Sequence, residues 1–153
     1  MKIVVAIDSP ESAQTALEYL TSGKFSKTDE IHLVHAIVPQ FADMPVAGIP
    51  DVIGIEREAE QKLLGELAIA LEQELGSKPS IDIIYGETAE LIAQMCKRYN
   101  ADEAIVPSHA RHGFSRLWFG SVADDIVDAA PCTVVVLKMP ARNTVRAQDH
   151  PIG

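Results

Sequence analysis

The stretch "KIVVAIDSPESAQTAL" (residues 2–17) predicts a β-strand followed directly by an α-helix. Residues 3–7 form a continuous apolar run, mostly β-branched, which is typical of a strand covered on both faces. Ser9 is a favoured N-cap residue, and Pro10 fits the first position of a helix. The apolar residues beyond them keep helical spacing: Ala13, Ala16, Leu17 and Leu20. The chain therefore opens with a buried strand and an amphipathic helix.

The remaining sequence repeats this alternation. Further buried strands are expected at 30–38, 80–87, 102–107 and 132–138. Helices are expected in the periodic segment that ends at Leu75, at 89–99 and at 121–130. Gly76 is a natural C′ residue for the first of these helices, and Asn100 can take the left-handed cap after the second. Residues 39–54, rich in proline and glycine, are interpreted as a long loop. Five strands alternating with four helices predict an α/β, doubly wound fold with a parallel sheet and right-handed crossovers.

Composition narrows the class of protein. A chain of 153 residues is the size of one domain, and 47% hydrophobic with 23% charged residues is ordinary for a globular protein. The formal net charge of −9 argues against nucleic acid as a partner, because a phosphate backbone would be repelled. No apolar run approaches the roughly 20 residues of a membrane span, and no signal peptide is recognisable. We expect a cytoplasmic protein whose Cys96 and Cys132 are free thiols rather than a bridge.

In open parallel sheets, ligands bind beyond the carboxyl ends of the strands. Three places in this chain fall at that edge: Asp8, the strand end near Ala36, and the connection 108–119. The connection has 12 residues, whereas such loops usually need about 2–6. Asp8 suits a ribose hydroxyl or a metal held by a triphosphate, although it could instead belong to the capping turn. We favour the ligand, because Ser9 already fills the capping role.

The helix expected at 121–130 opens with Gly120 and Ser121. Its first-turn N–H groups and the positive end of its dipole attract anions. Three side chains that suit a phosphate precede it: Arg111, His112 and Arg116. Ser121 with Asp124 also spells a capping box, which would satisfy the same N–H groups without a ligand. These residues alone support the helix cap and the anion site equally.

The histidines give little support to catalysis. His109 and His112 are three residues apart, and no cysteine or carboxylate close in sequence completes a metal site. His32 and His35 are expected to be hydrogen-bonded residues of the core or of an interface. No nucleophile can be paired with a base, so an enzyme is the least favoured reading.

The chain resembles the universal stress protein family. The resemblance covers residues 1–138, and its most specific part is the last of four motifs. These motifs are "KIVVAIDSPESAQTAL", "IHLVHAI", "YGETAELIAQMCKRYNADEAIVPSH" and "FGSVADDIVDAAPCTVVVLK". The resemblance implies an adenine nucleotide alpha-hydrolase-like fold with strand order 3-2-1-4-5. We expect a domain at 1–138 and a flexible tail at 139–153.

Members of this family that bind ATP carry Gly-x2-Gly-x9-Gly-[Ser/Thr]. Here the spacing is kept, but Pro107 and Ala110 replace the first two glycines. Proline removes a backbone donor, and alanine adds a Cβ where phosphate should approach closely. The resemblance thus implies a modified, weakened site for ATP, ADP or AMP with Mg²⁺. Its residues would be Asp8, Ser9, Ala36, Pro107, His109, Ala110, Arg111, Gly120, Ser121 and Val122.

The resemblance also implies a regulatory homodimer in the stress response. The dimer would form through the edge strand 132–138, whose unpaired N–H and C=O groups need a cover. One alternative is a protein–protein interaction module on the same scaffold, with an unknown protein partner and no nucleotide. A slow ATPase or a nucleotidyl transferase that uses His109 or His112 ranks last.

Overall fold

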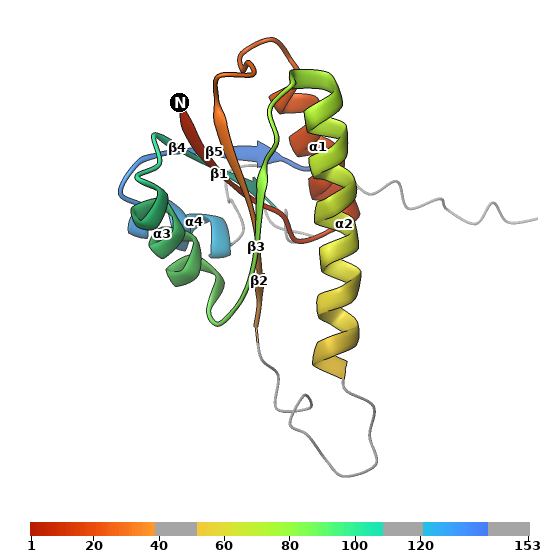
Figure 1. Ribbon diagram of the computed structural model, residues 1–153. Coiled ribbons are helices and arrows are strands. Elements are labelled where there is room, and N and C mark those ends of the chain that lie inside the picture. The colour runs from red at the N-terminus through yellow and green to blue at the C-terminus, as the bar shows by residue number, and fades with distance from the viewer. Residues whose placement is uncertain (39–51, 109–120, 141–153) are drawn as a thin grey trace, which may run out of the picture.

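A computed structural model of the chain describes residues 1–38, 52–108 and 121–140. Five parallel strands form one sheet in the order β3-β2-β1-β4-β5 (Figure 1). The strands are β1 (Lys2–Ala6), β2 (Glu30–Ile37), β3 (Ser80–Tyr85), β4 (Glu103–Ser108) and β5 (Thr133–Lys138). The helices are α1 (Pro10–Leu20), α2 (Val52–Leu75), α3 (Thr88–Tyr99) and α4 (Ser121–Ala129). The predicted doubly wound fold, its strand order and its four helices are confirmed.

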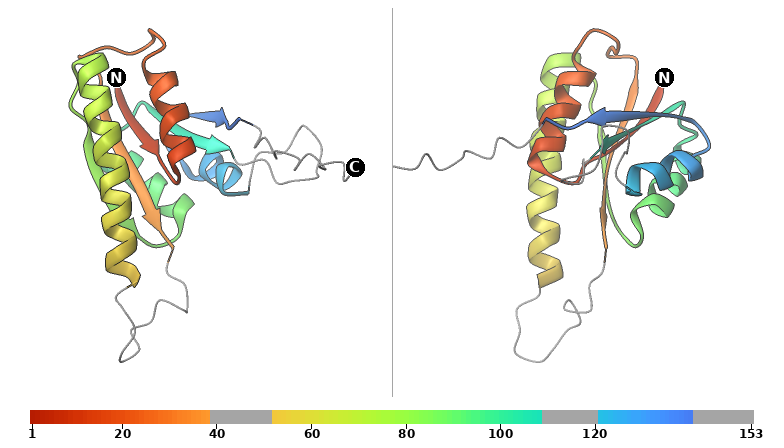
Figure 2. Two further views of the ribbon diagram at one scale, coloured as in Figure 1. Left: turned by 90° about the vertical axis from the view of Figure 1, so that its right-hand side faces the viewer. Right: turned by 180° about the vertical axis from the view of Figure 1, so that it is seen from behind.

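The helices cover the two faces of the sheet in pairs. Helices α1 and α2 lie on one face, and α3 and α4 lie on the other (Figures 1 and 2). Successive residues of β1 therefore enter different cores: Ile3 and Val5 pack with α1 and α2, while Val4 packs with α3 and α4. All three are completely buried. This burial explains why the first strand is an unbroken apolar run.

The predicted start of α1 is confirmed in detail. Ser9 is the N-cap, and its Oγ accepts a hydrogen bond from the backbone N–H of Ser12 at 3.1 Å. In return, Ser12 Oγ accepts from the backbone N–H of Ser9 at 3.0 Å. This reciprocal pair is a capping box built from two serines. Pro10 occupies the first helical position, where its missing N–H needs no partner.

Two helix ends also match their predictions. Asn100 follows α3 in the left-handed conformation at φ +51°, and Gly76 follows α2 at φ +71°. Cys96 and Cys132 are free thiols, as expected, the first buried and the second half-buried.

The start of α2 differs from the prediction. The helix begins at Val52, so residues 52–54 of the predicted loop 39–54 are helical. The part of that loop at 39–51 lies outside the described residues, as does the tail from residue 141. The third strand ends at Tyr85 rather than at residue 87, because Glu87 serves as the N-cap of α3. No helix in the described part of the chain is both long and apolar enough to cross a bilayer.

Candidate functional site

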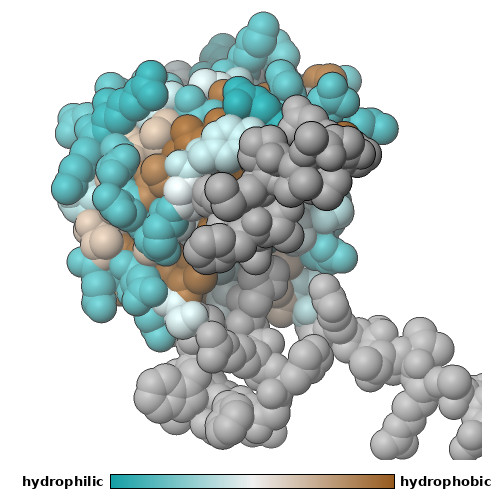
Figure 3. Space-filling model, turned by 90° about the horizontal axis from the view of Figure 1, so that it is seen from below, coloured by the Kyte–Doolittle hydropathy of each residue, from teal (hydrophilic) through white to brown (hydrophobic). Residues whose placement is uncertain are grey.

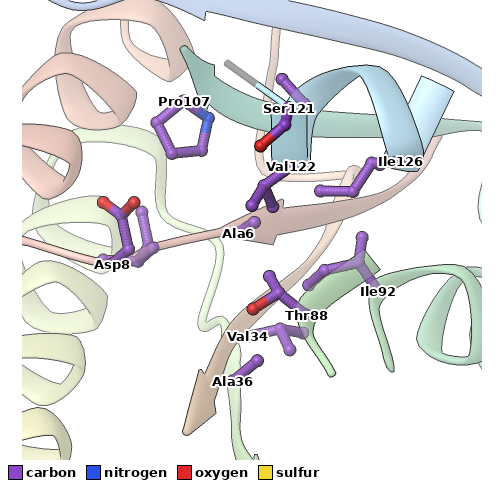
Figure 4. Close-up of a pocket in the computed structure, with 12 residues that line it drawn as sticks. Ala6, Asp8, Val34, Ala36, Thr88, Ile92, Pro107, Ser121, Val122 and Ile126 are labelled. Atoms are coloured by element: carbon purple, nitrogen blue, oxygen red, sulfur yellow. The ribbon is translucent and has the colours of Figure 1, made fainter. Parts of the chain in front are cut away.

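A cavity of about 310 Å³ lies at the carboxyl ends of β1, β2 and β4 (Figure 4). It is closed on two further sides by the beginnings of α3 and α4. The lining residues are Ala6, Ile7, Asp8, Val34, Ala36, Thr88, Ile92, Pro107, Ser121, Val122, Ala123 and Ile126. Strands β1 and β4 are neighbours here, and the order of strands reverses between them. In open α/β sheets this reversal point is where ligands bind.

The cavity brings together half of the residues that the sequence predicted for a binding site. Asp8, Ala36, Pro107, Ser121 and Val122 all line it. Ser9 is used as the helix cap and is not among the lining residues. Four predicted residues lie outside the described part of the chain: His109, Ala110, Arg111 and Gly120. The roles of all ten in binding remain predictions.

Asp8 is positioned by its backbone. Its N–H donates to Ser12 Oγ at 3.0 Å, which ties the residue to the first turn of α1. The preceding residue, Ile7, donates its N–H to the carbonyl oxygen of Val34 in β2 at 2.9 Å. Because Ser9 supplies the cap, the carboxylate of Asp8 is not needed for that role. The structure places this side chain on the wall of the cavity (Figure 4).

His35 holds the backbone next to Asp8 by a hydrogen bond. Its Nδ1 hydrogen-bonds the carbonyl oxygen of Ile7 at 2.7 Å, and the side chain is buried. A carboxylate oxygen of Glu60, from α2, lies 3.6 Å from the same nitrogen. His35 is thus a hydrogen-bonded core residue, as predicted, and it fixes the backbone beside Asp8.

Pro107 lies at the end of β4. The paired register of β4 with β1 ends at Ile105, whereas its register with β5 continues through Pro107 to Ser108. At Pro107 the strand is therefore paired on one side only, and this is the place in a sheet where proline is best tolerated. Its ring forms part of the cavity wall (Figure 4).

The cavity wall is mainly apolar. Nine of its twelve residues have apolar side chains, and the three polar ones are Asp8, Thr88 and Ser121. Asp8 carries the only charge among these twelve. Such a surface, with a few polar groups at separate points, is typical of a site for a small organic molecule. Seen from the carboxyl ends of β2 and β3, hydrophobic residues form a strip that is bordered on its left by hydrophilic ones (Figure 3).

Sequence reasoning missed seven of the lining residues. They are Ala6, Ile7, Val34, Thr88, Ile92, Ala123 and Ile126. Most are apolar residues of predicted strands and helices, and nothing in their local pattern separates them from ordinary core residues. Thr88 had a usable signal, because it directly precedes the helix predicted at 89–99 and follows a predicted parallel strand. Among the described residues there is no group of three or more His, Cys, Asp or Glu side chains that could hold a metal ion.

The fold and the cavity define a doubly wound α/β domain with a cavity at the switch point of its sheet, where ligands bind in proteins of this class. The sequence profile of the universal stress protein family matches residues 1–138, and the chain belongs to this family. A similar protein, universal stress protein A homolog 2 of Coxiella burnetii, is 28% identical over 142 residues. That match covers 90% of this chain and 94% of the relative.

Solved structures show the same fold. A universal stress protein family protein from Arabidopsis thaliana with AMP bound superposes with a TM-score of 0.62 at 22% identity. The match covers 96% of this chain and 97% of that one. A universal stress protein from Archaeoglobus fulgidus in complex with dAMP gives a TM-score of 0.62 at 20% identity, covering 90% and 98%. These likenesses confirm the predicted adenine nucleotide alpha-hydrolase-like fold.

Proposed function

We propose that this universal stress protein binds an adenine nucleotide weakly in the cavity at the switch point and acts as a cytoplasmic regulatory protein in the stress response. The observation that carries the proposal is the convergence of Asp8, Ala36, Pro107, Ser121 and Val122 on one cavity. These residues come from β2, β4, α4 and the connection between β1 and α1, which lie far apart in the sequence. The AMP and dAMP complexes of proteins with the same fold support the choice of ligand.

Asp8 is assigned to the ribose. A carboxylate at the end of a parallel strand accepts hydrogen bonds from two sugar hydroxyls, which are charge-assisted and stronger than neutral ones. Asp8 is also the one lining carboxylate that could reach a Mg²⁺ ion held by a triphosphate. The apolar side chains of the cavity offer a surface for the base.

Weak triphosphate binding follows from the cavity wall. Pro107 presents a ring and no backbone N–H where a glycine loop would donate to phosphate. None of the twelve described lining residues is basic. We therefore expect ATP to gain little affinity over AMP, because additional phosphates find few new donors on the described wall.

Isothermal titration of the full chain with ATP, ADP and AMP, each with Mg²⁺, tests the proposal. We expect dissociation constants below the millimolar range that differ little among the three ligands. Asp8→Asn should weaken all three by at least about tenfold, because it removes a charge-assisted partner of the ribose. Glu74→Gln removes the same charge on an exposed position of α2 and should leave binding unchanged. Absence of binding to millimolar concentrations would refute the nucleotide site.

A protein–protein interaction module without a nucleotide is the second candidate. It is favoured by Pro107, whose ring occupies part of the wall that a phosphate loop would use. The double variant Pro107→Gly, Ala110→Gly separates the two functions. If the native chain fails to bind AMP and the variant binds it, the native protein uses the scaffold without the ligand. If both bind, the first proposal stands.

We also propose a homodimer through β5. This strand is at the edge of the sheet, and its residues are half-buried or exposed within the single chain. An apolar edge strand needs a cover, and a second copy related by a two-fold axis supplies one.

A further inference from the structure

The first turns of α3 and α4 both border the cavity, but they differ in how well they can bind an anion. At α3 the carboxylate of Glu87 accepts hydrogen bonds from the backbone N–H groups of Ala89 and Glu90, at 3.1 and 2.9 Å. These are the donors that a helix would otherwise offer to a phosphate. Glu87 thus occupies them and adds a negative charge beside them. A phosphate group is disfavoured at this end of the cavity.

The other end of the cavity suits a phosphate better. Ser121 is the first residue of α4 and lines the cavity (Figure 4). The start of a helix carries a partial positive charge that favours anions. Asp8 lies between the two ends, because β1 is the strand between β2 and β4. Strands β2 and β4 are two strand spacings apart, about 10 Å, so one small molecule can contact all three places.

These positions orient the ligand along the edge of the sheet. With its phosphate at α4 and its ribose at Asp8, a nucleotide places its base between the end of β2 and the start of α3. The wall there consists of Val34, Ala36, Ile92 and Thr88. Figure 4 shows these four side chains grouped together, away from Pro107 and Ser121.

Thr88 is the one polar side chain at this base end. It is the first residue of α3, and the helix cap is supplied by Glu87 rather than by the threonine hydroxyl. Within the described part of the chain, that hydroxyl makes no hydrogen bond. Thr88 is a half-buried residue, and a hydroxyl that lines an apolar cavity with no hydrogen-bond partner in the described part of the chain is available to a ligand.

We infer that the hydroxyl of Thr88 hydrogen-bonds the polar edge of the base and makes Thr88 the residue that distinguishes a purine from an apolar ring of the same shape. This inference rests on the proposed function and names the part of the ligand that the site selects. The hydroxyl can donate to a ring nitrogen or accept from an exocyclic amine. A ring without such groups leaves the hydroxyl of Thr88 unpaired against the bound ligand, and this discriminates against such a ring.

The test compares two ligands on three proteins by isothermal titration. The ligands are AMP and benzimidazole riboside 5′-phosphate, which keeps the fused rings but has no nitrogen in its six-membered ring. The native chain should bind AMP about fivefold to tenfold more tightly than the benzimidazole nucleotide. Thr88→Val, which keeps the shape without the hydroxyl, should bind the two alike. Thr88→Ser, which keeps the hydroxyl, should discriminate as the native chain does.

The outcomes distinguish a failure of this inference from a failure of the proposed nucleotide binding. If Thr88→Val keeps the native preference for AMP, the inference is wrong while the nucleotide site stands. If the native chain binds neither nucleotide, the proposed function fails and the inference fails with it. Ribose 5-phosphate should bind the native chain and Thr88→Val equally, because it has no base. An equal loss for ribose 5-phosphate in Thr88→Val would reveal a disturbed helix start and overturn the assignment to the base.

Discussion

His32 illustrates how a polar side chain is held inside this sheet. It is 4% exposed, and its Nδ1 lies 2.6 Å from the hydroxyl oxygen of Ser80 in β3. Its ring stacks on Tyr99 of α3 with centroids 3.5 Å apart. Burial lowers the pKa of His32 below its ordinary value, although the carboxylate of Glu30, 3.0 Å from Nε2, opposes the shift. The neutral imidazole is therefore the form that the folded protein prefers.

A pH dependence of stability follows at this residue. As the pH falls below about 6.5, His32 gains a proton in the unfolded chain before it does so in the folded one. The contribution of His32 to stability is complete above that pH and is lost progressively below it. We expect His32→Phe, which keeps a ring against Tyr99, to reduce the slope of unfolding free energy against pH between about pH 7 and pH 5.

Urea unfolding at a series of pH values measures this slope. The nearby groups Glu30, Asp82, Lys2, Arg98 and Tyr99 remain in the variant, so the comparison measures the loss of the imidazole together with its coupling to these groups. An unchanged slope would show that His32 titrates alike in both states.

At the scale of the element, the cap of α1 is a local source of stability. Ser9 accepts the N–H of Ser12, and its loss leaves that donor without a protein partner at the start of the helix. We expect Ser9→Ala to lower the free energy of unfolding by about 1 kcal/mol. Gln14→Ala, on the exposed side of the same helix, should change it by less than about 0.5 kcal/mol. Denaturant unfolding measures the free energy of unfolding of both variants. Equal losses in the two variants would exclude a specific role for the Ser9 cap.

The predicted elements were most accurate where a capping signal is present in the sequence. The serine cap of α1, the left-handed Asn100 and the glycine after α2 each satisfy backbone groups at a helix end, and each was recognised from its residue type. The predicted start of α2 was wrong, because Gly54 and the nearby prolines indicate a loop in the sequence. The helix of 24 residues needs only one nucleation step, and each residue added at its end then gains a hydrogen bond. This gain outweighs the weak helix propensity of the residues at 52–54.

At the scale of the whole molecule, β5 determines how copies of the chain could assemble. Successive residues of a strand direct their N–H and C=O groups to opposite sides, so either Val134 or Val135 faces the open edge. We expect one of the variants Val134→Pro and Val135→Pro to stay folded but become monomeric, because proline then blocks only the open edge. The other variant should also lose stability, since it interrupts the pairing with β4.

Analytical ultracentrifugation gives the mass of each species, and circular dichroism reports its folding. A native chain that sediments as a monomer at all concentrations would refute the dimer. A folded proline variant that keeps the mass of a dimer would place the interface elsewhere.

The sequence alone was sufficient to predict the order of strands and helices, the class of fold and the edge of the sheet at which the cavity lies. Hydrophobic periodicity and helix caps depend on neighbours within a few residues, and the rule that parallel strands end at one edge then places Asp8, Ala36 and Pro107 together. Only the tertiary structure identified Thr88, Val34 and Ile92 as parts of the same cavity. These residues share a surface because α3 packs across β1 and β2. A contact between elements that are distant in the chain cannot be predicted from the local sequence pattern of either element.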